Sequence, residues 1–335
     1  MIINVLDCTL RDGGYVNNWE FDVPTARRIM DRLYDAGIRY IEVGILGGNA
    51  TPGKQTKFNS PSEIAPYLAG RKPDCHYAVM FTQENAGSFV FPPCGDDTPD
   101  CIRIAFFKKT WREAFSTVKE LKEKGYRVFL QAMATFMYSD GELADLIANV
   151  NETEPAAFYM VDSFSTMFPD DVTRMRDFVL SRLSPSVAFG FHAHNSIQMA
   201  FANAQTFLSG APDRELFLDC SVFGMGRGAG NVPTELLLEH LNSTQGTRYD
   251  VLPAIEAFET DLKPVYEQYG WGYTLPYFLV ARHRVNSVYG WYFGSHGITD
   301  PITLDRCLSM IPEDCKYTLK RDIADKIMET VKNDG

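Results

Sequence analysis

Short apolar runs rich in β-branched residues recur along the first two thirds of the chain, and a longer stretch follows each of them. Eight of these runs predict β-strands, at residues 3–7, 40–44, 76–81, 102–106, 127–133, 157–162, 187–191 and 216–221. The runs alternate little between apolar and polar positions, which is typical of parallel strands buried on both faces. Their starts lie roughly 25 to 37 residues apart, about the length of one strand–helix unit. Eight such units favour an α/β fold of the closed (β/α)8 type, a TIM barrel, over the alternative of an open doubly wound sheet.

Helical spacing between the runs supports this alternation. Residues 24–36 repeat apolar positions every three to four residues and stop at Gly37, a residue typical of helix ends. Similar patterns cover residues 111–124, 169–183 and 197–208. The unit between the third and fourth strands is the weakest, because residues 83–99 are rich in proline and loop-like. A helix at 233–241 would close the barrel, so we assign residues 1–245 to a TIM-barrel catalytic domain.

The rest of the chain, residues 246–335, has a different pattern. Helices are expected at 250–269, 276–289 and 319–331, and no strand–helix alternation continues there. We therefore predict an appended C-terminal helical region. Such a region could cover the mouth of the barrel or mediate contacts with another copy of the chain or with a partner.

Composition and charge narrow the classes of function. The 335 residues are 45% hydrophobic and 22% charged, as in an ordinary globular protein, and the formal net charge is −11. An acidic chain is a poor candidate for binding nucleic acid or an anionic membrane, because both require basic patches. No apolar run approaches a membrane span, and the N-terminus does not resemble a signal peptide. Seven scattered cysteines without a CxxC pair indicate reduced thiols in a cytoplasmic protein.

The candidate chemistry lies where strands of a barrel would end, since active sites of such barrels lie at the C-terminal ends of the strands. His192 and His194 follow the seventh run, and residues two apart in an extended chain point to the same side. Two such imidazoles can hold one divalent metal ion. The first strand would supply an oxygen ligand, Asp12 or Asp7, and the guanidinium of Arg11 can bind an oxygen of a substrate.

Other motifs are weaker. Four glycines between Gly224 and Asn231 indicate a close approach of the backbone to the site, but their spacing does not match a dinucleotide-binding fingerprint. Ser163 follows Asp162 at the end of the sixth run without the GxSxG context of a serine hydrolase. The pair at 108–109 (KK) is expected to be solvated. No phosphate-binding GK[ST] loop is present in the sequence.

Four motifs occur together and in order: TLRDG at 9–13, IEVG at 41–44, HAHN at 192–195 and GMGRGAGN at 224–231. In this combination the chain resembles the DRE-TIM metallolyase superfamily, the HMGL-like proteins, which includes pyruvate aldolases, HMG-CoA lyases and isopropylmalate synthases. The resemblance implies a divalent metal, Mn or Mg with other ions open, bound by the three residues Asp12, His192 and His194. It also implies that Arg11 stabilises an enolate and that Glu42 and Asn231 lie in the active site.

Within the superfamily, the GxGxGAGN run and the segment 271–277 are most similar to the 4-hydroxy-2-oxovalerate aldolase branch. That branch has a catalytic histidine just after its Arg-Asp-Gly motif, where this chain has Gly14 and Tyr15. We therefore consider Tyr15, Tyr273 or a metal-bound water as the base. Substrate contacts are expected from four residues: Arg11, Asp162, Ser163 and Asn231.

The resulting hypothesis is a metal-dependent aldolase acting on a small 2-oxo acid and an aldehyde. One alternative is an acyl-CoA-dependent synthase of the Claisen type, as in isopropylmalate and homocitrate synthases. Another is a non-catalytic barrel that serves as a scaffold. Each of these hypotheses is compatible with a homo-oligomer.

Overall fold

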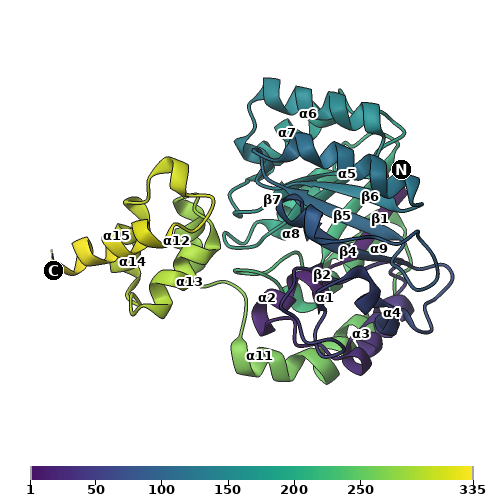
Figure 1. The fold of residues 1–335 in the computed structure, drawn as a ribbon, viewed down its shortest axis with the longest axis horizontal. Coiled ribbons are helices and arrows are strands. Elements are labelled where there is room, and N and C mark those ends of the chain that lie inside the picture. Colours follow the sequence, from purple (N-terminus) through teal and green to yellow (C-terminus); the bar gives the residue numbers. More distant parts are fainter. Residues whose placement is uncertain (1, 334–335) are drawn as a thin grey trace.

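A closed barrel of eight parallel strands forms the body of the protein (Figure 1). The computed structural model describes residues 2–333. The barrel strands are β1 (Ile2–Asp7), β2 (Tyr40–Leu46), β4 (His76–Thr82), β5 (Cys101–Phe106), β6 (Arg127–Ala132), β7 (Ala157–Asp162), β8 (Ala188–Ala193) and β9 (Glu215–Cys220). β1 pairs with both β9 and β2, which closes the barrel. The predicted (β/α)8 barrel is thus confirmed and the open-sheet alternative is wrong. One further strand, the short β3 (Lys57–Phe58), is added beside β2.

Helices on the outside of the barrel connect most of the strands. They are α3 (Val23–Asp35), α4 (Ala65–Leu68), α5 (Trp111–Glu123), α6 (Asp140–Thr153), α7 (Pro169–Leu180), α8 (Ala200–Leu208) and α9 (Thr234–Gln245). Local residues explain their starts: the carboxylate of Asp22 accepts a hydrogen bond from the backbone N–H of Thr25 at 3.0 Å, and Ser139 with Glu142 forms a capping box at α6. The connection after β4 holds only a 3-10 segment, Gln83–Ser88, as its loop-like sequence suggested.

Apolar side chains fill two layers of the barrel. The larger cluster lies between the strands and the surrounding helices. A second cluster is formed by inward-facing strand residues and is rich in rings, with Tyr40 and Phe217 4.8 Å apart and Phe129 and Phe217 5.1 Å apart. These rings fill the interior of the barrel, and a polar pair, Arg127 and Tyr40, lies at the N-terminal ends of the strands. All seven cysteines are free thiols.

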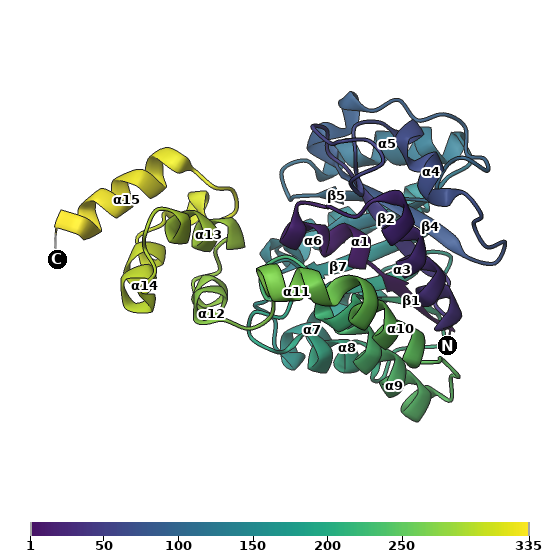
Figure 2. The same cartoon turned by 90° about the horizontal axis from the view of Figure 1, so that it is seen from below.

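The chain after the barrel has two parts. α10 (Leu252–Ala257), the π-helical turn Phe258–Leu262 and α11 (Lys263–Tyr269) pack on the barrel, and Ala257 and Leu262 belong to its core. The remaining helices are α12 (Leu275–Arg282), α13 (Ser287–Ser295), α14 (Pro301–Ser309) and α15 (Arg321–Asn333). They share a separate apolar core and stand beside the barrel in both views (Figures 1 and 2). The division at residues 245 and 246 stays a prediction.

The sequence-based helices in this region were partly wrong. The single helix expected at 276–289 is split into α12 and α13, because Arg284 adopts a left-handed conformation with φ of 54°. Asn286 then caps α13 by accepting a hydrogen bond from the N–H of Val288. α14 was not foreseen. Across residues 2–333, no helix combines the length and the apolar character that crossing a membrane requires.

Candidate active site

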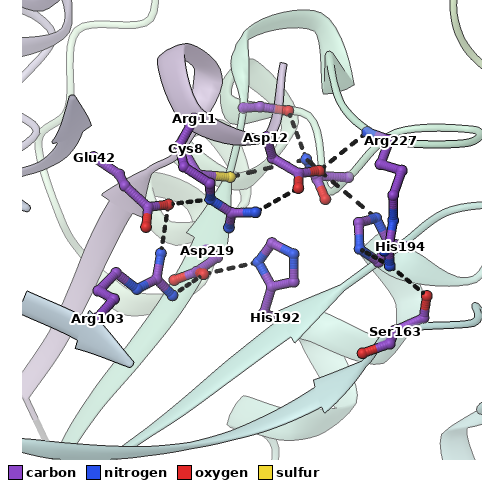
Figure 3. A network of polar contacts seen from close by, with 12 residues as sticks. Cys8, Arg11, Asp12, Glu42, Arg103, Ser163, His192, His194, Asp219 and Arg227 are labelled. Atoms are coloured by element: carbon purple, nitrogen blue, oxygen red, sulfur yellow. Dashed lines mark hydrogen bonds and ion pairs between the residues drawn. The ribbon is translucent and has the colours of Figure 1, made fainter. Parts of the chain in front are cut away.

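Three buried side chains meet at the C-terminal end of the barrel (Figure 3). Asp12 ends the short helix α1 (Thr9–Asp12), which follows β1 directly. His192 lies in β8 and His194 comes just after it, so both rings point to the same side, with centroids 4.9 Å apart. One ligand atom from each of the three residues lies within 4.8 Å of the other two. β1 and β8 end at the same rim of the barrel. The structure therefore brings together the three residues expected to bind a metal.

A carboxylate behind His192 sets its orientation. Nδ1 of His192 lies 2.8 Å from Oδ2 of Asp219, at the end of β9. This hydrogen bond fixes the tautomer and leaves Nε2 facing the cluster, as in many carboxylate–histidine–metal arrangements. Asp219 was missed by the sequence analysis.

Asp12 is held in its ionised form. Its Oδ2 accepts hydrogen bonds from Nδ2 of Asn231 at 2.9 Å and from the backbone N–H of Arg227 at 3.1 Å, and Oδ1 pairs with Arg11. Burial alone would raise the pKa of Asp12, but the Arg11 guanidinium beside it holds this pKa well below its usual range. Burial also lowers the pKa of His194, so its imidazole is neutral. A cation requires its ligands in these deprotonated forms.

Orphaned polar atoms indicate that this cluster suits a cation. Within the described residues, Nδ1 of His194 and Oδ1 of Asn231 are buried and have no hydrogen-bond partner. Nδ1 of His194 lies 3.8 Å from Oδ2 of Asp12, too far for a hydrogen bond. Unpaired buried polar atoms are rare in native proteins and often mark an ion or water. Two imidazole nitrogens and one carboxylate oxygen form a donor set that fits a divalent transition metal or Mg²⁺.

A chain of alternating charges connects Arg11 to His192 through the interior of the barrel. Nε of Arg11 donates to Oε2 of Glu42 at 2.6 Å, and Nη1 of Arg103 donates to the same oxygen at 2.8 Å. Arg103 also pairs with Asp219. Arg103 and Glu42 have no exposed side-chain surface. Glu42 therefore positions Arg11 from behind rather than facing the cavity.

The sequence analysis did not identify Arg103 either, although a charged residue within an apolar strand could have indicated it. In β5, Arg103 lies between buried apolar neighbours, and in β9 so does Asp219, whereas Glu215 at the start of β9 is only partly buried. A buried charge is found almost only where it is paired. A charge within an otherwise apolar strand therefore marks a functional or structural pair.

A small cavity of about 40 Å³ opens beside the cluster. Its polar wall is formed by Arg11, Asp12, Tyr15, Ser163, His192, His194, Gln131 and Arg227. Its remaining wall is apolar, with Met80, Ala105, Met133 and Val161. Positive charge and a candidate cation site thus share one partly apolar pocket, which suits a small anionic substrate.

The glycine-rich segment lies directly against this pocket. A Cβ on Gly226 would lie 2.6 Å from Oδ2 of Asp12 and closer still to Nδ2 of Asn231, so only glycine fits there. The expected close approach of the backbone is therefore seen. The sequence analysis assigned no role to the side chain of Arg227. Its Nη2 donates to the carbonyl of Ser163 at 3.0 Å and lies 3.4 Å from Nε2 of His194.

Other candidates lie away from the cluster. Asp7 accepts hydrogen bonds from Thr9 and Thr234 instead of facing the cluster. Tyr273 lines a neighbouring cavity of about 320 Å³ rather than the small pocket. Tyr15 does line the pocket; it is 43% exposed, yet desolvation of its hydroxyl raises its pKa.

Asp162 is turned toward its own loop. Its carboxylate accepts hydrogen bonds from the backbone N–H groups of Thr166 at 2.9 Å and Met167 at 3.1 Å. Burial raises the pKa of Asp162 to about 6. The neighbouring Ser163 lines the pocket, and its Oγ accepts from the N–H of Ala134. A contact of Asp162 with substrate is not supported by this geometry.

The raised pKa of Asp162 gives a testable pH dependence. The folded state holds the proton of Asp162 more tightly than the unfolded state does. The protonated carboxyl therefore adds to the free energy of unfolding, and this contribution is fully present below the unfolded pKa of about 4. This contribution falls as the pH rises through about 6. The unfolding free energy of the wild type should therefore decrease relative to Asp162→Asn by up to about 3 kcal/mol between pH 4 and pH 7. Urea unfolding at stepped pH measures this difference, and a constant difference would contradict the raised pKa.

Known proteins resemble the chain in sequence and in fold. The HMGL-like family model matches residues 2–260. An oxaloacetate decarboxylase of Mycobacterium tuberculosis is 30% identical over 247 residues, which cover 71% of this chain and 69% of that protein. A 4-hydroxy-2-oxovalerate aldolase of Thermomicrobium roseum is 29% identical over 273 residues, which cover 78% and 73%. Among solved structures, the N-terminal domain of a Bacteroides vulgatus protein provisionally described as an aldolase has a TM-score of 0.75 at 28% identity. This similarity covers 89% of this chain and 99% of that domain.

Both curated relatives are named for enzymes that cleave carbon–carbon bonds. The expectation of a carbon–carbon lyase is therefore confirmed, and neither the acyl-CoA-dependent synthase nor the non-catalytic scaffold is favoured. The family match includes the whole barrel and all three residues of the buried cluster. The chain belongs to the HMGL-like family.

Proposed function

We propose that this protein is a divalent-metal-dependent aldolase that breaks or forms the carbon–carbon bond next to a 2-oxo acid, with the enolate of pyruvate as the reactive species. One observation carries the proposal: the buried group of Asp12, His192 and His194 shares a cavity with the guanidinium of Arg11. A guanidinium beside a candidate ion site suits an anionic substrate on which further negative charge develops during the reaction.

Asp12, His192 and His194 would hold the ion, which supplies a Lewis acid that polarises the keto oxygen of the substrate. Arg11 is fixed through Glu42 and Asp12, so its charge is positioned before the substrate arrives. A preorganised guanidinium stabilises developing enolate charge without reorganising during the reaction. Ser163, Asn231 and Arg227 complete the polar surroundings.

In the cleavage direction, the C3–C4 bond of a 4-hydroxy-2-oxo acid breaks. The C4 hydroxyl gives up its proton and becomes the aldehyde, and the electron pair passes to C3, which is later protonated to give pyruvate. Tyr15 is the titratable side chain of the pocket outside the arginines and the ion ligands. Its raised pKa keeps the phenol protonated. In the addition direction it can therefore give a proton to the alkoxide oxygen formed from the aldehyde, and in cleavage little phenolate is present to act as a base.

The scarcity of phenolate favours a second candidate, decarboxylation of oxaloacetate. There the C3–C4 bond breaks with loss of carbon dioxide, and no hydroxyl proton has to be removed. The same pyruvate enolate forms and is protonated at C3. The similarity to the mycobacterial oxaloacetate decarboxylase supports this candidate independently.

Exchange of the pyruvate methyl protons tests the step that both candidates share. With Mn²⁺ in deuterium oxide, we expect the protein to replace the C3 protons of pyruvate by deuterium, which proton NMR follows directly. Removal of the metal with EDTA should stop the exchange, and added Mn²⁺ or Mg²⁺ should restore it. Undiminished exchange after metal removal, or none with Mn²⁺, Mg²⁺, Co²⁺ or Zn²⁺, would reject the proposal.

A substrate comparison then separates the two candidates. Pyruvate release from 4-hydroxy-2-oxopentanoate and from oxaloacetate is measured by coupling to lactate dehydrogenase. Free metal ions also decarboxylate oxaloacetate, so the rate of the His192→Ala variant is subtracted. Turnover of the hydroxy acid supports the aldolase, and turnover of oxaloacetate alone supports the decarboxylase.

A further inference from the structure

A second, larger cavity lies at the mouth of the barrel. It measures about 590 Å³, is partly open to solvent, and is bordered by the glycine-rich segment, the chain after α11 and helices α12 and α13. Tyr15 and Arg227 line both this cavity and the small pocket beside the ion cluster, so the two spaces meet at these side chains. Most small-molecule sites in proteins have volumes of about 300–1,000 Å³. We call the larger cavity the vestibule.

The small pocket is far smaller than a typical ligand site. Its volume of about 40 Å³ is room for roughly three water-sized molecules. With the 2-oxo acid held beside Asp12 and Arg11, the aldehyde end has to pass Tyr15 and Arg227. That path leads into the vestibule.

The wall of the vestibule is aromatic. It includes the rings of Tyr15, Trp271, Tyr277 and Trp291, together with Arg227. Among the described residues, no carboxylate lines it. Phenol hydroxyls, Ser287 and Arg227 supply polar contacts, and rings make up much of the remaining wall. A flat aromatic group gains by stacking on rings and on a guanidinium plane.

Helix α13 presents this wall with one of its faces. Tyr289, Tyr292 and Phe293 pack into the separate core of the C-terminal helices. On the other face, Val288 and Trp291 line the vestibule and are 37% and 65% exposed. A tryptophan exposed to this degree beside other exposed rings is a common mark of a binding site.

We propose that the vestibule binds the aldehyde part of the aldol substrate and selects aldehydes that carry an aryl group. The inference rests on the proposed aldolase function and specifies its second substrate. In the addition direction, C3 of the pyruvate enolate forms a bond to the aldehyde carbon, and the aldehyde oxygen takes up a proton. The aryl group then contacts the rings that line the vestibule.

Aldol addition of pyruvate to two aldehydes tests this assignment. We expect kcat/KM for benzaldehyde to exceed that for acetaldehyde by about tenfold or more. Trp291→Ala should lower kcat/KM for benzaldehyde by about tenfold, while the value for acetaldehyde changes less than twofold. Trp291→Phe, which keeps an aromatic ring, should recover most of the lost rate.

Ile302→Ala is the matched control, since Ile302 is 73% exposed on α14 of the same helical unit and does not line the vestibule. It should leave both aldehydes unaffected. Equal use of the two aldehydes, or an unchanged benzaldehyde rate in Trp291→Ala, would overturn the vestibule assignment, while turnover of 4-hydroxy-2-oxopentanoate would still support the aldolase. A change of oligomeric state in Trp291→Ala, measured by analytical ultracentrifugation with aldehyde selectivity intact, would identify this face as a protein interface instead. Loss of exchange in the wild type would reject the proposed function itself.

Discussion

Replacing His192 with alanine is expected to abolish tight binding of divalent metal and with it the turnover of any 2-oxo acid. The variant loses one of three clustered donors and also leaves Oδ2 of Asp219 without its imidazole partner. Changes to residues that merely orient a metal ligand cost about 10- to 100-fold in affinity, so loss of a ligand should cost at least about 100-fold. Isothermal titration with Mn²⁺ measures the binding, and the pyruvate exchange rate measures the activity.

His240→Ala provides the control for this experiment. His240 lies in α9, away from the cluster, and pairs with Gln205. We expect its metal affinity and exchange rate to match the wild type. If His192→Ala bound Mn²⁺ as tightly as His240→Ala, the cluster of Asp12, His192 and His194 would not be the metal site.

Replacing Arg103 with methionine should destabilise the protein and weaken the site together. Methionine roughly preserves the volume but leaves the carboxylates of Glu42 and Asp219 in the barrel interior without the cation that joins them. Removing one member of a buried charge group costs about 3–5 kcal/mol, because the remaining charge is not compensated. Urea unfolding followed by circular dichroism measures the loss. Mn²⁺ affinity should fall too, since Asp219 no longer holds His192 in place.

A double variant distinguishes charge from packing. Arg103→Met combined with Asp219→Asn removes one of the unpaired carboxylates, so part of the lost unfolding free energy should return. Metal affinity should not recover, because the neutral amide introduced at position 219 would not hold the imidazole as the carboxylate does. If Asp219→Asn instead lowered the unfolding free energy of Arg103→Met further, the unpaired carboxylates would not be the source of the lost stability.

Much of the barrel could be predicted because its strands are buried on both faces. A continuous apolar run then marks each strand, and the runs agree with the observed strands to within about two residues. The C-terminal helices were harder, because their boundaries depend on tertiary contacts. Nothing in the residue type of Arg284 signals its left-handed backbone, which ends α12 and starts α13.

The grouping of residues at the candidate site was also predictable, but their side-chain directions were not. Asp12, His192 and His194 could be grouped because strand exits converge at one rim of a barrel. The direction of each side chain at that rim was not predictable: Asp162 turns to the backbone of its own loop, and Tyr273 turns to another cavity. Arg103 pairs with residues of two distant strands, and such pairing follows from the closed barrel rather than from any local pattern.

The separate core of helices α12 to α15 has a consequence for how this enzyme can evolve. Trp291 and Val288 belong neither to that core nor to the core of the barrel. Substitutions at such exposed positions usually change stability by less than about 0.5 kcal/mol. Under the proposed assignment, the face of α13 that lines the vestibule can change at almost no cost to folding, while the candidate ion cluster at the end of the barrel stays unchanged.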